Sequence, residues 1–434
     1  MPVAVLRPPG VPEKTPPKDP SATYRQSQRA LDGAAFCLAD VADGLGPFLV
    51  IYLTTQRHWT SGEAGLAMSL MLVGTVLSQT FVGAWIDQTR YKRLAVAMSA
   101  VFVAASCIFM YHLPNRVMIY GLQLATGVAV TVFPPALAAI SLGFVGRPRL
   151  PARAGRNEAC FHAGNVVAAL LAIGGSWCFG SAGVFYGVAV MAIGSAVSVL
   201  LIHESDIDHH AARGADGLEG DAQILPWVNL LRDPRIICFT AAVVLFHFAN
   251  AAMLPLVGQK VGHQLADKAS ALMGACIIVA QLTMVPVAIL ASRAAVFGRR
   301  PVFLIGFAIL PLRGLCYTLT DNPWLLIANQ ILDGIGAGIF GVVALLMMAD
   351  MTKGTGRFNF AQGLVATAIG LGAALSNVLT GLIVDAAGYN AGFWFLTTVA
   401  VAALCLFTLT VQETLETTTE SGERSQGVYT EQPR

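Results

Sequence analysis

Twelve stretches of about 20 apolar residues recur along this chain of 434 residues, and each is long enough to cross a lipid bilayer as a helix. Only 12% of the residues are charged, where soluble domains carry roughly 25%, and the mean hydropathy is +0.65. A soluble protein of this composition could not cover its surface with polar side chains. The pattern therefore predicts an all-α polytopic membrane protein. Its spans are expected near residues 33–55, 63–86, 94–112, 117–143, 158–179, 182–203, 236–257, 269–291, 301–319, 324–348, 360–383 and 390–411.

The distribution of Lys and Arg indicates how these spans are oriented, because basic residues gather in the cytoplasmic loops of membrane proteins. With the N-terminus placed in the cytoplasm, 22 of the 27 Lys and Arg residues fall on that side, and Arg313 falls inside a span. Only Arg57, Arg116, Lys260 and Lys268 fall on the opposite side. This bias favours an even number of spans. It predicts an integral protein of the cell membrane with both termini in the cytoplasm.

The longest internal connection divides the chain into two halves of six spans each. Its first part is polar, and the adjacent His209 and His210 there are typical of a solvated linker rather than a metal site. Its end, residues 224–232, has the spacing of an amphipathic helix that lies on the membrane surface. The predicted parts are a disordered cytoplasmic tail over residues 1–30, a six-helix bundle over 31–203, the linker over 204–235, a second six-helix bundle over 236–412 and a disordered cytoplasmic tail over 413–434.

The two halves repeat each other in sequence. The run Phe-x-x-Ala-(Asp/Asn)-x-Ala begins at Phe36 in the first span and again at Phe246 in the seventh. A second run, Gln-x-x-x-Gly-(x5)-Phe, begins at Gln123 in the fourth span and at Gln330 in the tenth. Parallel repeats of this kind place a cargo site between the halves, near the middle of the membrane.

The loop between the second and third spans carries a family resemblance. It reads Gly83-Ala-Trp-Ile-Asp87-Gln-Thr-Arg90-Tyr-Lys92-Arg93, and the matching loop of the second half ends Gly298-Arg299-Arg300. Together with the six-plus-six layout, these loops resemble the paired signature Gly-x-x-x-Asp-(Arg/Lys)-x-Gly-(Arg/Lys)-(Arg/Lys) of the major facilitator superfamily. In this chain Arg90 replaces the second glycine, and the second loop lacks the acidic residue. The resemblance covers residues 31 to 412 and implies twelve transmembrane helices in two pseudo-symmetric bundles.

The loop chemistry predicts a cytoplasmic gate. Gly83 allows close approach of two helices in lipid. Asp87 can accept hydrogen bonds from the positive N-terminus of the eleventh span, which faces the same side, and such a contact would hold the halves together. Alternatively, the basic residues only follow the positive-inside rule. The predicted gate residues are Gly83, Asp87, Arg90, Lys92, Arg93, Arg299 and Arg300.

Two departures from the family pattern concern drug/proton antiport. Proton-coupled drug exporters of the superfamily often carry an Arg in the fourth span, where this chain has Gln123. Their fifth span has a Gly-Pro ahead of Gly-Gly, whereas this span has Gly164 and Gly174-Gly175 without a Pro. Proton coupling, if the chain uses it, has to run through other groups.

Two carboxylates in the first span, Asp40 and Asp43, are the leading candidates for that role. They are three residues apart and so share one face of a helix. A charge inside a membrane costs about 2.5 to 3.5 kcal/mol and persists only where it meets a partner, water or a cargo. The two residues are predicted to carry protons or to contact a cationic cargo, the alternative being simple pairing near a helix end.

Arg313 in the ninth span and Asp333 in the tenth have opposite charges and similar distances from the turn at Asn322-Pro323, which places them at similar depth. They are predicted to form a buried pair, either structural or linked to transport. If Arg313 is unpaired, it becomes an anion site instead. Uncharged polar residues inside spans are predicted to contact the cargo or, alternatively, to hydrogen-bond between helices, with His247 and Asn250 the leading candidates for the cargo: Gln123, His162, Asn165, His247, Asn250, Gln330 and Gln362.

These features predict a secondary transporter that works by alternating access, most simply one that exports a small amphipathic organic compound in exchange for protons. The alternatives are uptake or exchange of an organic anion or nutrient through Arg313, and a non-transporting membrane sensor. No catalytic or nucleotide-binding motif is present, so an enzyme is not expected. The expected partners are a small-molecule substrate, protons and the lipid bilayer. We expect a monomer that binds no cofactor, metal or nucleic acid.

Overall fold

The computed structural model describes residues 22–43, 45–113, 115–215, 225–264 and 269–415, and every regular element within these ranges is a helix. The predicted all-α fold is therefore confirmed. Eleven helical stretches of the described chain are long and apolar enough to cross a membrane. The first predicted span adds to them, because it is divided between α1 (Ala22–Asp43) and α2 (Gly46–Thr55).

The first half continues with the helices that form spans two to six. These are α3 (Ser61–Gln88), α4 (Lys92–His112), α5 (Arg116–Val130), α6 (Phe133–Val145), α7 (Leu150–Phe179) and α8 (Ser181–Leu200), with a short 3-10 helix at Arg147–Arg149.

The linker and the second half follow in the same way. The linker holds a 3-10 turn at Glu204–Asp206, α9 (His209–Ala212) and α10 (Trp227–Arg232). The second half comprises α11 (Pro234–Ala251), α12 (Met253–Gln264), α13 (Ala269–Ala294), α14 (Arg299–Leu319), α15 (Pro323–Ala328), α16 (Gln330–Met351), α17 (Phe358–Ala387) and α18 (Tyr389–Thr410).

Three further spans are also divided into two helices, and the sequence explains the breaks. Proline lacks a backbone N–H and cannot continue the hydrogen-bond ladder of a helix. Pro134 and Pro135 follow the break between α5 and α6, and Pro255 follows the break between α11 and α12. Asn329 separates α15 from α16, and its side chain donates to the carbonyl oxygen of Arg313 at 3.0 Å.

Both predicted disordered tails overlap residues that the structure places, namely 22–30 and 413–415. Residues 22–30 belong to α1, and the buried Ser27 hydroxyl donates to Asp206 of the linker at 2.7 Å. At the other end of the chain, Glu413 accepts hydrogen bonds from the start of α14. The first part of the linker is also packed rather than fully solvated, because Ile207 and Ala212 are buried.

Glycine allows neighbouring helices to approach closely. A Cβ on Gly164 of α7 would overlap the carbonyl oxygen of Phe36 in α1, so this crossing requires glycine. Gly174, ten residues further along the same helix, has nothing within 4 Å of its Cβ position. The two positions therefore differ in packing although they lie on one helix.

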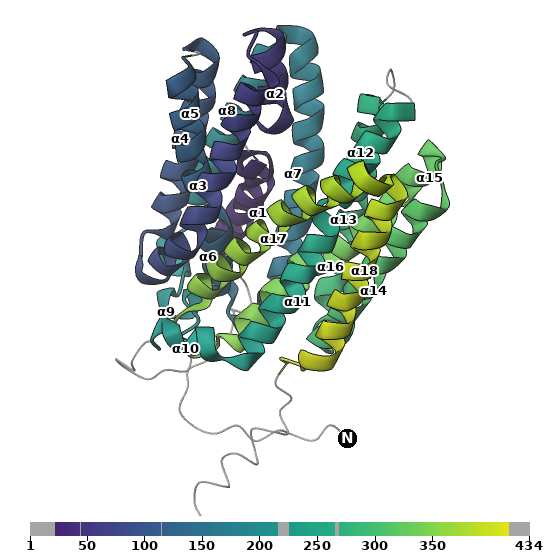
Figure 1. The fold of residues 1–434 in the computed structure, drawn as a ribbon. Helices are drawn as coiled ribbons and strands as arrows, with labels where there is room; N and C mark the ends of the chain where they lie inside the picture. Colours follow the sequence, from purple (N-terminus) through teal and green to yellow (C-terminus); the bar gives the residue numbers. More distant parts are fainter. Residues whose placement is uncertain (1–21, 44, 114, 216–224, 265–268, 416–434) are drawn as a thin grey trace, which may run out of the picture.

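The two halves meet at one end of the molecule. Figure 1 shows α9 and α10 at this end and shows the helices of the two halves diverging toward the opposite end. We call the end that holds the linker the linker side. Core residues of the second half pack with Leu142 of α6 and with Leu150 and Ala154 of α7, so the halves share packing there.

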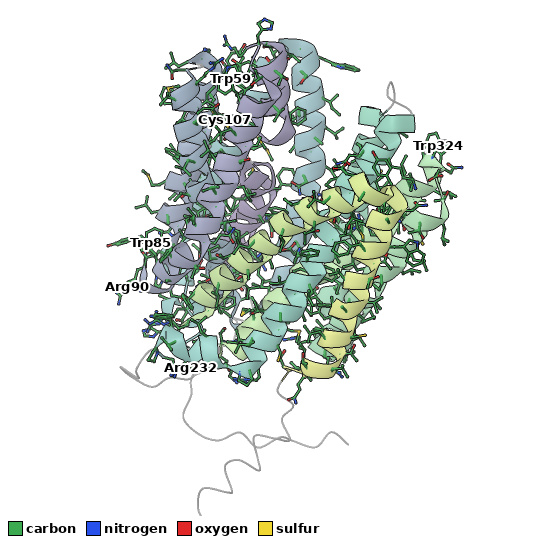
Figure 2. The ribbon with its side chains drawn as sticks, viewed as in Figure 1. Trp59, Trp85, Arg90, Cys107, Arg232 and Trp324 are labelled. Carbon is green, nitrogen blue, oxygen red and sulfur yellow. The ribbon has the colours of Figure 1, made fainter. Side chains whose placement is uncertain are left out.

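The outer surface of both halves carries many exposed apolar side chains, among them Phe81, Trp177 and Leu409. In water such a surface would drive association, whereas in a bilayer it faces lipid. Figure 2 shows Arg90 and Arg232 at the linker side and Trp59 and Trp324 toward the opposite end. The molecule is thus an integral membrane protein with an apolar belt between polar ends.

Candidate transport pathway

Two pairs of helices form the seams between the halves, α3 with α17 and α7 with α13. Glycine permits backbone contact at both seams. A Cβ on Gly83 would overlap the carbonyl oxygen of Asn359, and one on Gly155 would collide with the Ser292 side chain. The close approach predicted at Gly83 is therefore present, and its partner is the first turn of the eleventh span.

Asp87 lies at the centre of the α3–α17 contact. One carboxylate oxygen accepts from the Asn359 backbone N–H at 3.0 Å and from the Asn359 side-chain amide at 2.8 Å. The other accepts from the Phe360 N–H at 2.8 Å. These amides lie at the start of α17, where the helix dipole is positive and the backbone N–H groups have no partner within the helix. We call this contact the latch.

The linker reinforces the same helix end. The Phe358 N–H donates to the carbonyl oxygen of Arg213 at 3.2 Å, and the Arg357 side chain donates to the carbonyl oxygen of Leu225 at 2.9 Å. The start of α17 is therefore held by α3 and by the linker together.

The basic residues of the two matching loops mostly bind within their own half. Arg93 pairs with Glu204 and donates to the carbonyl oxygen of Ile202. The buried Lys92 donates to the carbonyl oxygen of Thr89 at 2.5 Å, and the Arg90 side chain is exposed. Arg93 thus joins the start of the third span to the end of the sixth, and neither its contacts nor that of Lys92 cross a seam.

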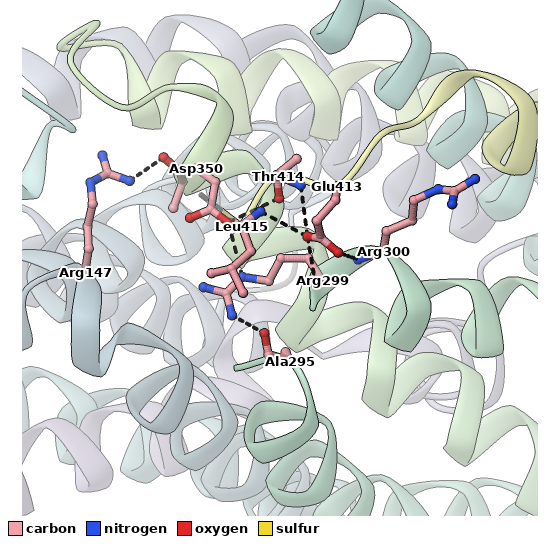
Figure 3. A network of polar contacts seen from close by, with 9 residues as sticks. Arg147, Ala295, Arg299, Arg300, Asp350, Glu413, Thr414 and Leu415 are labelled. Carbon is pink, nitrogen blue, oxygen red and sulfur yellow. Dashed lines mark hydrogen bonds and ion pairs between the residues drawn. The ribbon is translucent and has the colours of Figure 1, made fainter. Parts of the chain in front are cut away.

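The second half repeats this arrangement at Arg300, and Figure 3 shows Glu413 beside Arg299 and Arg300. Arg300 donates to the carbonyl oxygens of Thr408 and Val411 at the end of α18, at 2.7 and 2.8 Å. The Glu413 carboxylate accepts from the backbone N–H groups of Arg299 and Arg300 at 2.9 and 3.0 Å.

A further contact crosses between the halves beside this group. The Arg299 guanidinium pairs with Asp350 at 3.1 Å. Arg147 of the first half donates to the carbonyl oxygen of Ala349, next to Asp350 (Figure 3). Residues 413 and 414, which follow α18, and Arg147 of the first half therefore lie close together on the linker side.

The larger cavity between the halves has a volume of about 460 Å³. Its wall is mostly apolar, and Glu158 of α7 is the single ionisable side chain among the described residues that line it. The polar remainder of the wall consists of Thr75, Gln79, Thr131, Asn157 and Gln362. The cavity suits an apolar molecule with few polar groups and offers it one carboxyl group.

Glu158 belongs to a short polar chain that reaches the second half. Its carboxylate lies 3.6 Å from Nε2 of His162, one helical turn further along α7. Nδ1 of His162 lies 2.7 Å from Oε1 of Gln281 in α13. His162, predicted as a cargo contact, thus lies at a seam. The sequence places Glu158 at the mouth of the fifth span, as an interfacial or gate residue, and not among the predicted cargo or proton sites, although an acidic residue four positions before an intramembrane histidine shares its helix face.

A smaller cavity of about 190 Å³ adjoins the larger one, and both are lined by Glu158, Phe340 and Gly341. Arg313 and Asp333 line the smaller cavity, and their side chains form an ion pair at 2.6 Å. His162, His247 and Asn250 line it too, so five residues that the sequence singled out as functional gather there.

The guanidinium of Arg313 has four polar partners. Besides Asp333, it donates to Asn250 Oδ1 at 2.5 Å, to the Tyr317 hydroxyl at 3.0 Å and to Gln330 Oε1 at 3.4 Å. Gln330, predicted as a cargo contact, is fully buried behind this pair. Arg313 therefore offers no vacant charge to an anion.

The remaining predicted residues lie in different places. Gln362 lines the larger cavity and donates to Asn359 at 3.2 Å, which connects the cavity to the latch. Gln123 is buried against Met68, and the half-buried Asn165 lines neither cavity. Asp40 and Asp43 lie in the last turn of α1, but their side chains fall outside the described part of the structure.

No group of three or more His, Cys, Asp or Glu side chains in the described ranges is arranged to hold a metal ion.

Comparison with known proteins agrees with the fold. Residues 31–296 and 282–430 match the Major Facilitator Superfamily, and the chain belongs to this family. It is a membrane transporter and not an enzyme.

Among its relatives are two proteins of Mycobacterium tuberculosis, the "Uncharacterized MFS-type transporter MT2531" of strain CDC 1551 / Oshkosh and the "Uncharacterized MFS-type transporter Rv2456c" of strain H37Rv. Each is 46% identical over 391 residues, which cover 89% of this chain and 94% of the relative. The "Inner membrane transport protein YajR" of Escherichia coli K12 is 29% identical over 149 residues, 33% of this chain and 32% of that protein.

Proposed function

We propose that this transporter exports a small amphipathic organic compound in exchange for protons, with Glu158 as the proton-exchanging group. The observation that carries the proposal is the position of Glu158 in the wall of a largely apolar cavity between the halves. A carboxylate in such surroundings is costly unless a proton or a cation compensates its charge. Binding of one therefore displaces the other, which is the requirement for exchange.

The direction of transport follows from the membrane potential. An amphipathic cation crosses a bilayer unaided and is drawn toward the negative cytoplasm, at about 2.3 kcal/mol per charge for 100 mV. Its removal from the cell therefore requires a coupled energy source, whereas its entry does not. We place the linker side and both termini in the cytoplasm, in the cell membrane, and propose that the transporter acts as a monomer.

The paired state of Arg313 weighs against organic-anion uptake. All of the hydrogen bonds made by its guanidinium are directed to Asp333, Asn250, Tyr317 and Gln330. An anion would have to replace one of these partners inside the membrane. The same observation favours a cargo that is neutral or cationic.

The test is proton release by the purified, reconstituted transporter on addition of cationic, neutral and anionic compounds. We expect release with cations, and its loss in Glu158→Gln. Glu63→Gln is the matched control, because Glu63 caps the start of α3 and lines neither cavity. Asp40→Asn tests the residue predicted from the sequence. Release that persists in Glu158→Gln but is lost in Asp40→Asn would move the proton site to the first span.

A further inference from the structure

The smaller cavity shares part of its wall with the larger one, at Glu158, Phe340 and Gly341, but differs from it in chemistry. The wall shared by the two cavities contains Gly341, and a Cβ at this position would collide with the Glu158 carboxylate. Glycine therefore leaves room for the carboxylate at the junction. A molecule that occupies the larger cavity can extend past Glu158 into the smaller one.

The smaller cavity has an excess of negative charge when Glu158 is ionised. Its described acidic side chains are Glu158 and Asp333, and its basic side chain is Arg313, which Asp333 already pairs. His162 and His247 complete the set of titratable groups that face it. With both imidazoles uncharged, one negative charge remains without a counter-charge.

Aromatic rings form one wall of the same cavity. Phe340 stacks on Phe246 with 5.1 Å between ring centroids, and His247 meets Phe340 edge-on at 4.4 Å. Faces of aromatic rings attract cations, most strongly where water is excluded. The cavity thus combines a carboxylate, an aromatic wall and a volume of about 190 Å³, which suits a compact head group rather than a whole molecule.

We propose that the smaller cavity binds the cationic head group, an amine or quaternary ammonium, of an amphiphile whose apolar body occupies the larger cavity. This inference rests on the proposed function and specifies its substrate class. Asp333 has a defined part in it, because it cancels the charge of Arg313 and so allows Glu158 to attract the cation. Without Asp333, the positive charge of Arg313 would repel the head group.

The experiment compares three esters that share a benzoyl body: benzoylcholine, its uncharged isostere 3,3-dimethylbutyl benzoate, and the anion 2-sulfoethyl benzoate. Calorimetry with the full chain in nanodiscs measures each Kd together with the proton release. We expect benzoylcholine to bind at least tenfold more tightly than its isostere, and the anion to bind most weakly. Equal Kd values for benzoylcholine and the isostere would overturn the proposal without the use of any variant.

Asp333→Asn supplies the second arm. We expect the preference for the cation to fall to within about threefold, while the isostere keeps its affinity and thereby shows that the variant is folded. Asp350→Asn is the matched control. Asp350 lies on the same helix as Asp333 and pairs with Arg299, which lies on the same helix as Arg313, but Asp350 lines neither cavity. A preference for the cation that survives in Asp333→Asn would also overturn the proposal.

The proton signal separates the two proposals. Proton release by benzoylcholine without any preference over the isostere would overturn the head-group site and leave proton exchange intact. A strong preference that depends on Asp333 without proton release would overturn proton exchange and leave the head-group site intact.

Discussion

The latch gives the sharpest prediction for the closed linker side. Asp87→Asn keeps the shape of the side chain but removes its charge and one of its two acceptor oxygens. The wild-type carboxylate accepts three hydrogen bonds from Asn359 and Phe360, each 3.0 Å or shorter. A hydrogen bond to a charged group contributes about 1.5–3 kcal/mol, and the charge at a helix N-terminus adds roughly 0.3–1 kcal/mol. Loss of one such bond and of the charge therefore weakens the latch by on the order of 2 kcal/mol.

That loss is measurable as hydrogen exchange at the start of α17. The amides of Asn359 and Phe360 donate to Asp87, so their protection reports the latch directly. Since 1.4 kcal/mol corresponds to a factor of ten, we expect exchange of the peptide that contains both amides to accelerate about 30-fold in Asp87→Asn.

Glu413→Gln is the matched control for this measurement. Glu413 accepts two backbone N–H groups at the start of α14 in the same manner, but within one half. The variant should accelerate exchange in α14 and leave α17 unchanged. Unchanged exchange of α17 in Asp87→Asn would refute the assignment of a closing role to Asp87.

Three further predictions follow from individual contacts. Burial raises the pKa of Glu413, but backbone N–H donors outweigh this effect and hold the pKa below its ordinary value of 4.5. The stabilisation from Glu413 is therefore complete above pH 4.5 and is lost as the pH falls through the lowered pKa of the folded state. The difference in Tm between wild type and Glu413→Gln should accordingly be present at pH 7 and vanish in acid. Gly164→Ala should lower the stability by about 1–3 kcal/mol through overpacking, whereas Gly174→Ala on the same helix should raise it by up to about 1 kcal/mol, and equal Tm values for the two variants would contradict the packing argument. Arg313→Leu should cost about 3–5 kcal/mol because it leaves Asp333 unpaired inside the membrane, and combining it with Asp333→Leu should restore most of the Tm; a double variant no more stable than the single one would show that the ion pair is not what Arg313 contributes.

The spans and the central ion pair could be predicted because each depends on local sequence. The turn at Asn322-Pro323 fixes the relative depth of Arg313 and Asp333. These arguments need only helical periodicity and the length of a span. The latch joins distant residues, and its prediction also needed the orientation of the spans and the positive N-terminus of the eleventh span.

The sequence does not indicate that Glu158 lines the cavity, because it predicts the start of the fifth span too late. The predicted span began at residue 158, which put Glu158 at its mouth, but α7 begins at Leu150. Eight residues of helix correspond to about 12 Å, so Glu158 lies more than two turns beyond the start of α7. The first turns of α7 contain Arg153 and Arg156, whose charges hide the helix from a hydropathy argument.

The order of residues 22–30 and of Glu413 depends on tertiary contacts. Residues 22–30 are polar and gave no apolar signal, but Ser27 is buried against Asp206 of the linker, 179 residues away. Glu413 gains its role from the start of α14, 113 and 114 positions earlier. Pairings over such distances cannot be derived from composition or periodicity.

The latch also determines which substitutions can change how firmly the linker side closes. On the α17 side, two of its three donors are backbone N–H groups, and every residue type except proline supplies this group. Substitution of Phe360 by any residue except proline therefore leaves its donor in place, whereas any change at Asp87 other than to glutamate removes the charge of the acceptor. Natural or laboratory substitutions can thus change the strength of the latch chiefly at one residue, Asp87. Suppressors of an Asp87 variant should arise at sites other than residue 360.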